Sequence, residues 1–130
     1  MANWIYYNRN QDGEHISDCV TRAISTATGL SYPQIRKKLH HTSRLFSCDK
    51  LTRDCYSNLL DRVFQFQRVN GKGMNVGEFA DIHPYGTFIV RVPNHATTII
   101  NGNIYDIFDC RDYPCDIVWQ IKNTTEFVAR

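Results

Sequence analysis

Apolar residues recur at helical spacing near the start of the chain, in the segment 17–29. The residues at positions i, i+3, i+4 and i+7 of this segment are Val20, Ala23, Ile24 and Ala27. They form one apolar stripe of a helix. Ser17 or Asp18 suits the N-cap, because a side-chain oxygen there accepts free N–H groups of the first turn, and Gly29 suits the C-terminal stop. The pattern therefore predicts a helix whose first turn contains Cys19.

Three further helices are predicted in the middle of the chain. The segment Ser31–Gln34 resembles a capping box with proline in the first turn, and it opens a helix that continues through Leu39. Residues 51–64 carry apolar side chains at helical spacing, so this helix is expected to pack on the first. Asn75 is a cap residue followed three positions later by Glu78, which predicts a short fourth helix.

The pattern then changes to two β-rich runs between residues 86 and 109, which flank Asn101-Gly102. This dipeptide is the strongest short signal of a hairpin. A two-residue loop puts His95 and Asp106 on one face as diagonal neighbours. A three-residue loop instead pairs His95 with Asp109 and turns Asp106 away, because a slip of one residue flips every side chain. We favour the two-residue loop as the simpler turn and keep Asp109 as the alternative.

These elements predict one α+β domain over residues 1–122, in which N-terminal helices pack on a C-terminal antiparallel sheet. The last strand is expected at 117–122, and residues 123–130 are expected to be a tail. A chain of 130 residues that is 42% hydrophobic suits one core. No run approaches the roughly 18 apolar residues of a membrane helix, and the first seven residues do not resemble a signal peptide. A cytosolic setting is therefore expected.

The five cysteines are interpreted as agreeing with that compartment, since their number is odd and no dense disulfide framework is evident. Cys110 and Cys115 are separated by five positions, and Cys48 and Cys55 by seven. Such spacings are poor for zinc sites, so neither a metal nor a cofactor is expected. Cys48 and Cys55 are interpreted as core or helix residues.

A net charge of +2 says little about partners. Residues 36–41 make a local basic patch on the second predicted helix, but no aromatic residues are interleaved there and no nucleic-acid motif is present. The patch is interpreted as a solvated helix face, and neither a nucleic acid nor a membrane is expected as a partner. An acidic substrate can still be steered by such a patch.

Cys19 and His95 are the residues with the clearest catalytic potential. First-turn N–H groups and the positive end of the helix dipole stabilise a thiolate, the reactive form of cysteine, and can help to hold an oxyanion. The His95 imidazole can take the thiol proton, while Asp106 or Asp109 fixes its orientation. Alone, Cys19 would be read as a small apolar core residue and His95 as a half-buried strand residue. Together they favour a thiol-dependent hydrolase.

Three features in this order resemble the papain-like cysteine peptidase superfamily. Asp18-Cys19 opens an early helix, His95-Ala96-Thr97 begins a late strand, and an aspartate lies on the following strand. The pattern more closely resembles small single-domain members from bacteria and their phages, related to bacteriocin-processing peptidases. The resemblance implies a papain-like fold with a Cys-His-Asp triad where the helices meet the sheet. In such peptidases an aromatic commonly lies two residues after the orienting residue, as Phe108 does after Asp106.

The chain departs from that family at the oxyanion-stabilising residue. Papain-like enzymes usually have a glutamine about six residues before the cysteine, and Gly13 stands in that region here. The nearby amides are Asn8, Asn10 and Gln11, with Gln11 preferred for its reach, although all three also suit ordinary turns. Loss of one oxyanion donor typically lowers the rate by about 10²–10³.

The function expected from these observations is cleavage of an amide or isopeptide bond in a protein or peptide, through a thioester intermediate. Two alternatives stay open, the first implied by the resemblance and the second left open by the uncertain oxyanion donor. One is a deamidase or transglutaminase-like acyl transferase that uses the same machinery. The other is a catalytically weak or inactive binding module that sequesters a host or phage protein. A bacterial cytosol or that of a phage-infected host is the expected location.

Overall fold

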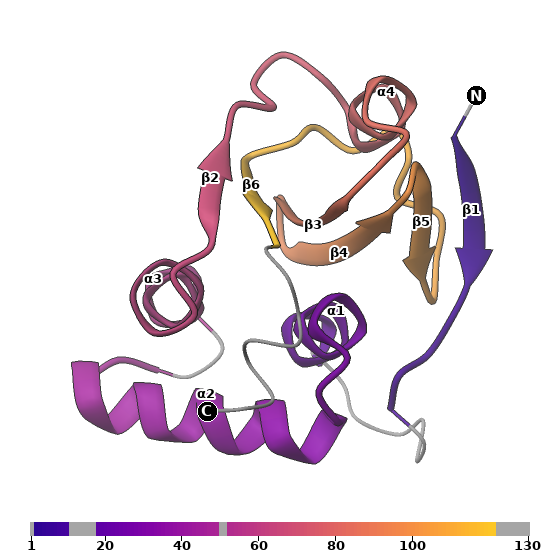
Figure 1. Ribbon diagram of the computed structural model, residues 1–130. Helices are drawn as coiled ribbons and strands as arrows, with labels where there is room; N and C mark the ends of the chain where they lie inside the picture. Colours follow the sequence, from indigo (N-terminus) through magenta and orange to yellow (C-terminus); the bar gives the residue numbers. More distant parts are fainter. Residues whose placement is uncertain (1, 11–17, 50–51, 122–130) are drawn as a thin grey trace.

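The structure is a computed structural model that describes residues 2–10, 18–49 and 52–121 (Figure 1). In these ranges all four predicted helices are present, and the third continues into a short π-helical segment, η1. The helical elements are α1 (Cys19–Thr28), α2 (Tyr32–Phe46), α3 (Arg53–Asn58), η1 (Leu59–Val63) and α4 (Val76–Ile82). No helix among the described residues is long and apolar enough to cross a lipid bilayer. The expected tail, 123–130, lies outside the described residues.

The predicted capping signals of α2 and α4 are confirmed. Ser31 Oγ accepts from the Gln34 backbone N–H at 3.2 Å, and the Gln34 side chain accepts from the Ser31 N–H at 2.8 Å. Asn75 and Glu78 make the same reciprocal pair at 2.8 and 3.0 Å. Gly29 ends α1 in the left-handed region with φ of 78°. Each sequence signal therefore acts through the backbone groups that a helix end leaves unpaired.

The described strands form one six-stranded mixed sheet in the order β1-β5-β4-β3-β6-β2. They are β1 (Asn3–Tyr6), β2 (Gln67–Val69), β3 (Thr87–Val92), β4 (His95–Ile100), β5 (Asn103–Asp106) and β6 (Ile117–Gln120). The α+β class is confirmed. The expectation of a wholly antiparallel sheet is wrong, because β1 pairs parallel with β5. β1 has four partly exposed side chains at the sheet edge, so it lacks the alternating pattern that marks a half-buried strand.

The hairpin between β4 and β5 has the predicted two-residue loop. Ile100 pairs with Asn103, which leaves Asn101 and Gly102 as the loop. Both loop residues have positive φ, 50° and 78°, as a type I′ turn requires. The Asn101 side chain also accepts from the Gly86 N–H at 3.0 Å, which fixes the turn against the start of β3. This register brings His95 and Asp106 to the same face.

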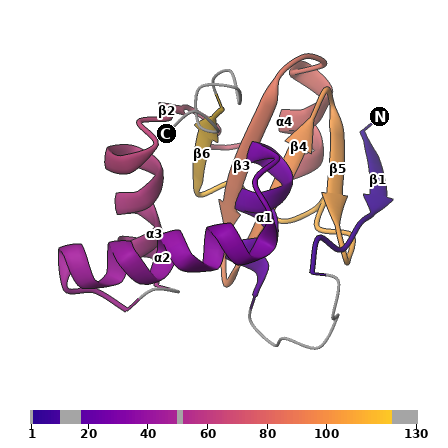
Figure 2. The same cartoon turned by 60° about the horizontal axis from the view of Figure 1, so that its bottom comes forward.

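Helices cover both faces of the central sheet (Figures 1 and 2). α1, α2, α3 and η1 pack against one face, where Ile89 and Trp119 point. α4 covers the other face, where Phe88 and Val90 point. Alternate residues of β3 therefore enter two different cores, which explains why this strand is almost continuously apolar. In the register of β3, β4 and β5, His95 and Asp106 share the face of Val92 and Ile104, which is the α4 side, whereas Cys19 packs against the core on the α1 side.

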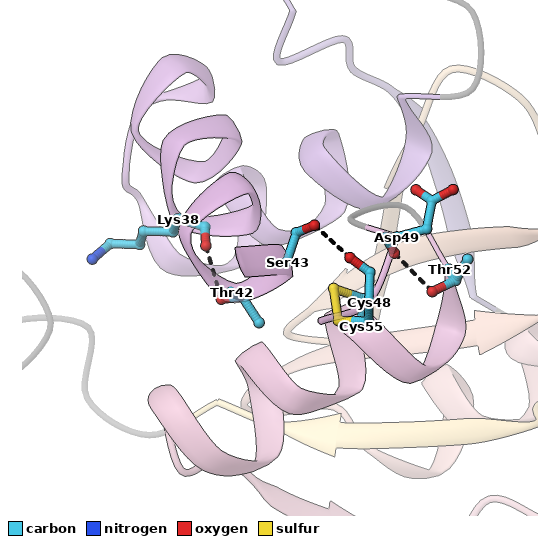
Figure 3. The surroundings of a disulfide bond; sticks show 7 residues. All are labelled: Lys38, Thr42, Ser43, Cys48, Asp49, Thr52 and Cys55. Atoms are coloured by element: carbon cyan, nitrogen blue, oxygen red, sulfur yellow. Dashed lines mark hydrogen bonds between the residues drawn. A yellow bond between two sulfur atoms is a disulfide. The ribbon is translucent and has the colours of Figure 1, made fainter. Parts of the chain in front are cut away.

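Cys48 and Cys55 form a disulfide between the end of α2 and α3 (Figure 3). This corrects the expectation that the cysteines form no disulfide, although Cys55 is a buried helix residue as predicted. The cause is local: Ser47 ends α2 in the left-handed region, and the Ser43 hydroxyl donates to the Cys48 carbonyl, so the chain turns back toward α3. Disulfides are typical of oxidising compartments, which weakens the cysteine-based argument for a cytosolic setting.

Candidate active site

Cys19 is the first residue of α1 and is half-buried, as the helix pattern predicts. α1 lies below the sheet in Figure 1 and in front of β3 and β4 in Figure 2. A buried hydrogen bond joins the two elements, because the Thr98 hydroxyl on β4 donates to the Ala23 carbonyl on α1 at 2.8 Å. This contact fixes the helix over the strand that begins at His95. The candidate nucleophile and the candidate base therefore come from elements far apart in the sequence.

His95 and Asp106 form a direct, buried pair. The distance from His95 Nε2 to Asp106 Oδ2 is 2.6 Å, and their side chains are 7% and 4% exposed. The Phe108 ring lies 4.4 Å from the imidazole, centroid to centroid, and covers it. The carboxylate can therefore fix the tautomer and orientation of the ring, as an orienting residue must.

Three groups hold the Asp106 side chain in addition to burial: the His95 imidazole, the Ile107 N–H and the Cys110 thiol. Oδ1 accepts from the Ile107 N–H at 2.7 Å, and Oδ2 lies 3.6 Å from the Cys110 thiol. Burial alone would raise the pKa of Asp106, but the hydrogen bond and charge of His95, with the Ile107 N–H, lower it. Asp106 is therefore held as a carboxylate.

The parallel edge strand β1 also fixes Asp106 through its backbone. Tyr6 pairs with Asp106 in the β1–β5 register. The Asp106 carbonyl accepts from the Tyr7 N–H at 3.0 Å and from the Trp4 indole N–H at 3.2 Å. Sequence reasoning missed this role, since the only available signal was a short run of aromatic residues near the start of the chain.

Asp109, the alternative orienting residue, lies away from His95. Both of its carboxylate oxygens accept from the Arg111 guanidinium, at distances between 2.6 and 3.1 Å. The hydrogen bonds from Arg111 lower the pKa of Asp109. The structure thus places Asp106 at the imidazole and Asp109 in a surface ion pair.

The site electrostatics favour a charged thiolate–imidazolium pair. Burial alone would raise the pKa of Cys19, but the hydrogen bond and charge of His95 and the N–H groups of Ala96 and Val20 together lower it. Burial alone would lower the pKa of His95, but hydrogen bonds with Asp106 and Cys19 raise it to about 9. At a pH between the lowered pKa of Cys19 and the raised pKa of His95, the sulfur is deprotonated and the ring is protonated. The Val20 N–H is one of the first-turn donors that the sequence predicts.

The other free cysteines have the opposite character. Burial, the leading cause for both thiols, raises the pKa of Cys110 to about 12 and that of Cys115 to about 11. Both remain protonated at neutral pH and are therefore weak nucleophiles. Cys19 alone among the three free cysteines has the pKa shift of a reactive thiol.

We expect the Cys19 thiolate to persist to lower pH than an ordinary cysteine thiolate. As pH rises, activity should increase when Cys19 loses its proton at its lowered pKa, and should decrease when His95 loses its proton near pH 9. The pH profile of kcat/KM should therefore be bell-shaped. The ultraviolet absorbance of the thiolate, taken as wild type minus Cys19→Ala, measures the acidic limb without a substrate. His95→Ala should move that step up to the range of a free thiol. A wild-type step already in that range would contradict the ion pair.

The structure does not bring the described amide candidates to Cys19. Asn10 is buried, and its side-chain amide donates to Asp18 Oδ2 at 3.0 Å. The Asn8 side-chain oxygen accepts from the Asn10 backbone N–H at 3.0 Å, as in a turn. Gln11, the preferred oxyanion donor, lies outside the described residues. Asn8 and Asn10 therefore have positions that organise the turn before the helix.

Asp18, the residue before the nucleophile, is the centre of a buried polar cluster. The sequence suggested that its side chain caps α1. Instead, the side chain makes no capping hydrogen bond and is buried. It accepts from Asn10 and from the Tyr32 hydroxyl at 3.1 Å, and it forms an ion pair with Arg22 one turn along α1. The i,i+4 spacing of Asp18 and Arg22 was the signal available in the sequence. This cluster joins residues 8–10, α1 and α2 directly beside Cys19.

We expect Asp18→Ala to lower the free energy of unfolding by about 3–5 kcal/mol, because it leaves the largely buried Arg22 charge without its partner. Urea denaturation followed by circular dichroism measures the change. Asp109→Ala is the matched control, since it breaks a more exposed pair with Arg111 and should cost less than about 1 kcal/mol. Equal losses for the two variants would contradict the structural role of the cluster.

His95, Asp106 and Cys110 also have the residue types of a metal site. One potential ligand atom from each lies within 4.8 Å of the others. However, the imidazole and carboxylate are hydrogen-bonded directly to each other at 2.6 Å, and the Cys110 thiol donates to the same carboxylate oxygen at 3.6 Å. Hydrogen bonding thus accounts for this arrangement, and we derive no metal chemistry from it.

The structure brings Cys19, His95 and Asp106 together at the junction of α1 and the sheet. Asn10 supports this junction through Asp18, and Asp109 lies outside it. The chain matches none of the protein-family models, curated proteins or solved structures with which it was compared. The functional interpretation therefore depends on the chemistry of these side chains.

Proposed function

We propose that the protein is a papain-like thiol hydrolase that cleaves an amide or isopeptide bond in a protein or peptide substrate. The observation that carries this proposal is the buried His95–Asp106 pair, with the Cys19 thiol near enough to the same imidazole for each of the two groups to shift the pKa of the other. The order of these residues along the chain, and the position of the cysteine at a helix start against a sheet, also support it. The expected compartment is the cytosol of a bacterium or of a phage-infected cell.

In the proposed reaction the Cys19 thiolate attacks the substrate carbonyl carbon and forms a carbon–sulfur bond. The first-turn N–H groups of α1 are the described donors best placed for the resulting oxyanion. The His95 imidazolium gives its proton to the leaving amine, and the carbon–nitrogen bond breaks to leave a thioester. Neutral His95 then takes a proton from water as its oxygen attacks the thioester carbon. The carbon–sulfur bond breaks, which releases the acid and regenerates the Cys19 thiolate and the His95 imidazolium. Asp106 stabilises the imidazolium in both stages.

The substrate can be sought by comparing new protein N-termini in cells that express wild type or Cys19→Ala. We expect a small set of termini that appear only with the wild-type protein and share residues around the cleaved bond. His95→Ala, produced at the same level, should remove the same set. An unchanged set of termini with all three proteins, together with co-purification of one intact host or phage protein, would instead favour the sequestering module.

A further inference from the structure

Positive charge is concentrated in one part of the chain. No aspartate or glutamate stands between Asp18 and Asp49, whereas the whole chain has a net charge of only +2. The cationic residues in this stretch are Arg22, Arg36, Lys37, Lys38 and Arg44. All except Arg22 belong to α2, which also carries His40 and His41.

The cations of α2 lie on its solvent side. Ile35, Leu39 and Thr42 are the buried residues of the helix and face the core. The exposed basic residues of α2, which we call the basic face, are Arg36, Lys37, His40, His41 and Arg44. At 3.6 residues per turn, Arg36, His40 and Arg44 follow one another about 6 Å apart along the helix. The basic face is thus a continuous row of positive and titratable groups.

The arginines of the basic face differ from most other arginines among the described residues. Four arginines elsewhere form ion pairs with aspartates that are not their immediate neighbours in the sequence: Arg22, Arg68, Arg91 and Arg111. Within the described ranges no hydrogen bond or ion pair joins Arg36, Lys37 or Arg44 to another side chain. These charges are therefore available to an anion outside the chain.

A groove lies beside the basic face, between α2 and η1. Its volume is about 440 Å³, which accommodates one or two side chains. Lys37, Lys38 and Arg44 line one side, whereas Leu59 and Val63 supply an aliphatic wall on the other. The wall offers no aromatic ring on which a nucleic-acid base can stack. Cations beside an aliphatic wall instead match a polypeptide that carries carboxylates and aliphatic side chains.

The basic face begins close to the candidate nucleophile. The Tyr32 hydroxyl, in the first turn of α2, donates to Asp18, which adjoins Cys19 in the chain. From Tyr32 to Arg44 the helix rises about 18 Å. An extended peptide covers this length with about five or six residues. A substrate bound at Cys19 can therefore continue along α2 over a short additional segment.

We propose that the basic face and its groove bind an acidic polypeptide segment, rich in Glu or Asp and interspersed with aliphatic residues, that belongs to the substrate. The assignment of the segment to a substrate depends on the proposed hydrolase function, whereas the binding itself requires no catalysis. Carboxylates pair with the unpartnered guanidinium and ammonium groups, and an aliphatic side chain enters the groove between α2 and η1. The charge contribution weakens as salt is raised.

The test measures binding of a fluorescein-labelled 12-residue peptide of alternating glutamate and leucine to full-length Cys19→Ala protein, by fluorescence anisotropy at low and high salt. Use of Cys19→Ala prevents turnover, so the result is independent of whether the protein is an enzyme. We expect Arg36→Glu/Arg44→Glu to weaken binding at least about tenfold, the effect of two lost charge contacts. The matched control Arg53→Glu/Lys72→Glu reverses two exposed charges elsewhere and should change Kd less than about twofold.

Circular dichroism melting curves that match wild type show that both double variants are folded. Equal binding by both double variants would overturn the proposal. A peptide with serine in place of leucine should bind more weakly than the glutamate–leucine peptide. Equal binding of the two peptides would show that the groove is not part of the binding site. Tighter binding of a short DNA duplex than of the acidic peptide, dependent on Arg36 and Arg44, would also overturn it, because the partner would then be a nucleic acid.

Discussion

Replacing Cys19 by alanine is expected to lower kcat by about 10⁴–10⁶, the loss seen when a triad nucleophile is removed. The variant cannot form the thioester, and no other cysteine can substitute. Cys110 is buried and protonated, and Cys115 belongs to the core on the α4 side of the sheet. The measurement is hydrolysis of a peptide that spans a cleaved bond, with turnover followed by mass spectrometry.

Cys115→Ala is the matched control for that variant. It removes a free thiol with a pKa of about 11, far from a reactive state, and should retain the wild-type kcat within about twofold. Any loss it causes should appear in thermal stability, because Cys115 is buried. Comparable turnover by Cys19→Ala and wild type would exclude the proposed chemistry.

Asp106→Asn is expected to lower kcat by about 10²–10⁴, with a smaller change in KM. The amide retains the size of the carboxylate but loses its charge, so the imidazolium of His95 is destabilised. Its pKa should fall from about 9, and the basic limb of the pH profile should move to lower pH with it. A role in stability alone would lower the yield of folded protein without moving this limb.

Asp109→Asn is the control that separates the two aspartates. The carboxylate of Asp109 is held by Arg111 at the surface, so its neutralisation should leave kcat and the pH profile unchanged. Similar losses for Asp106→Asn and Asp109→Asn would show that the orienting group does not act as the geometry suggests. A loss confined to Asp109→Asn would contradict the assignment of Asp106.

The parts of the fold that the sequence predicts are those determined by local chemistry. Ser31 and Asn75 bind backbone groups three residues away, and Asn101-Gly102 has the backbone freedom of a type I′ turn. These signals are sufficient for the helix starts and the hairpin register, and the register in turn selects Asp106 over Asp109. The closeness of Cys19 to His95 was inferred from their chemistry and the family resemblance, not from spacing.

Most features that the sequence did not predict are determined by long-range contacts, whereas the disulfide is determined by a local turn. β1 is exposed on a sheet edge, and only its pairing with β5 makes it a strand. Asp18 satisfies the local rule for an N-cap, but a buried cluster with Arg22 and Tyr32 overrides that preference. The disulfide depends on the turn after α2, which brings Cys48 to α3. Sequence periodicity contains no information about such contacts.

Three elements of the fold, α1, β4 and β5, each supply one side chain to the candidate site. α1 supplies Cys19 with first-turn N–H groups, β4 supplies His95, and β5 supplies a carboxylate that β1 holds through its backbone. Each side chain taken alone has an ordinary structural explanation. Their combination is typical of a functional site, since His95 and Asp106 are hydrogen-bonded and each of the three groups shifts the pKa of its neighbour toward the charged form.

Alkylation by iodoacetamide at neutral pH, followed by peptide mapping of all five cysteines, tests the central claim most directly. It requires no substrate and reports whether Cys19 is activated by its neighbours. We predict rapid modification of Cys19 ahead of every other cysteine in the folded protein, and a large loss of that selectivity in His95→Ala. Slow, similar modification of Cys19, Cys110 and Cys115, unchanged by His95→Ala, would contradict the proposed active site.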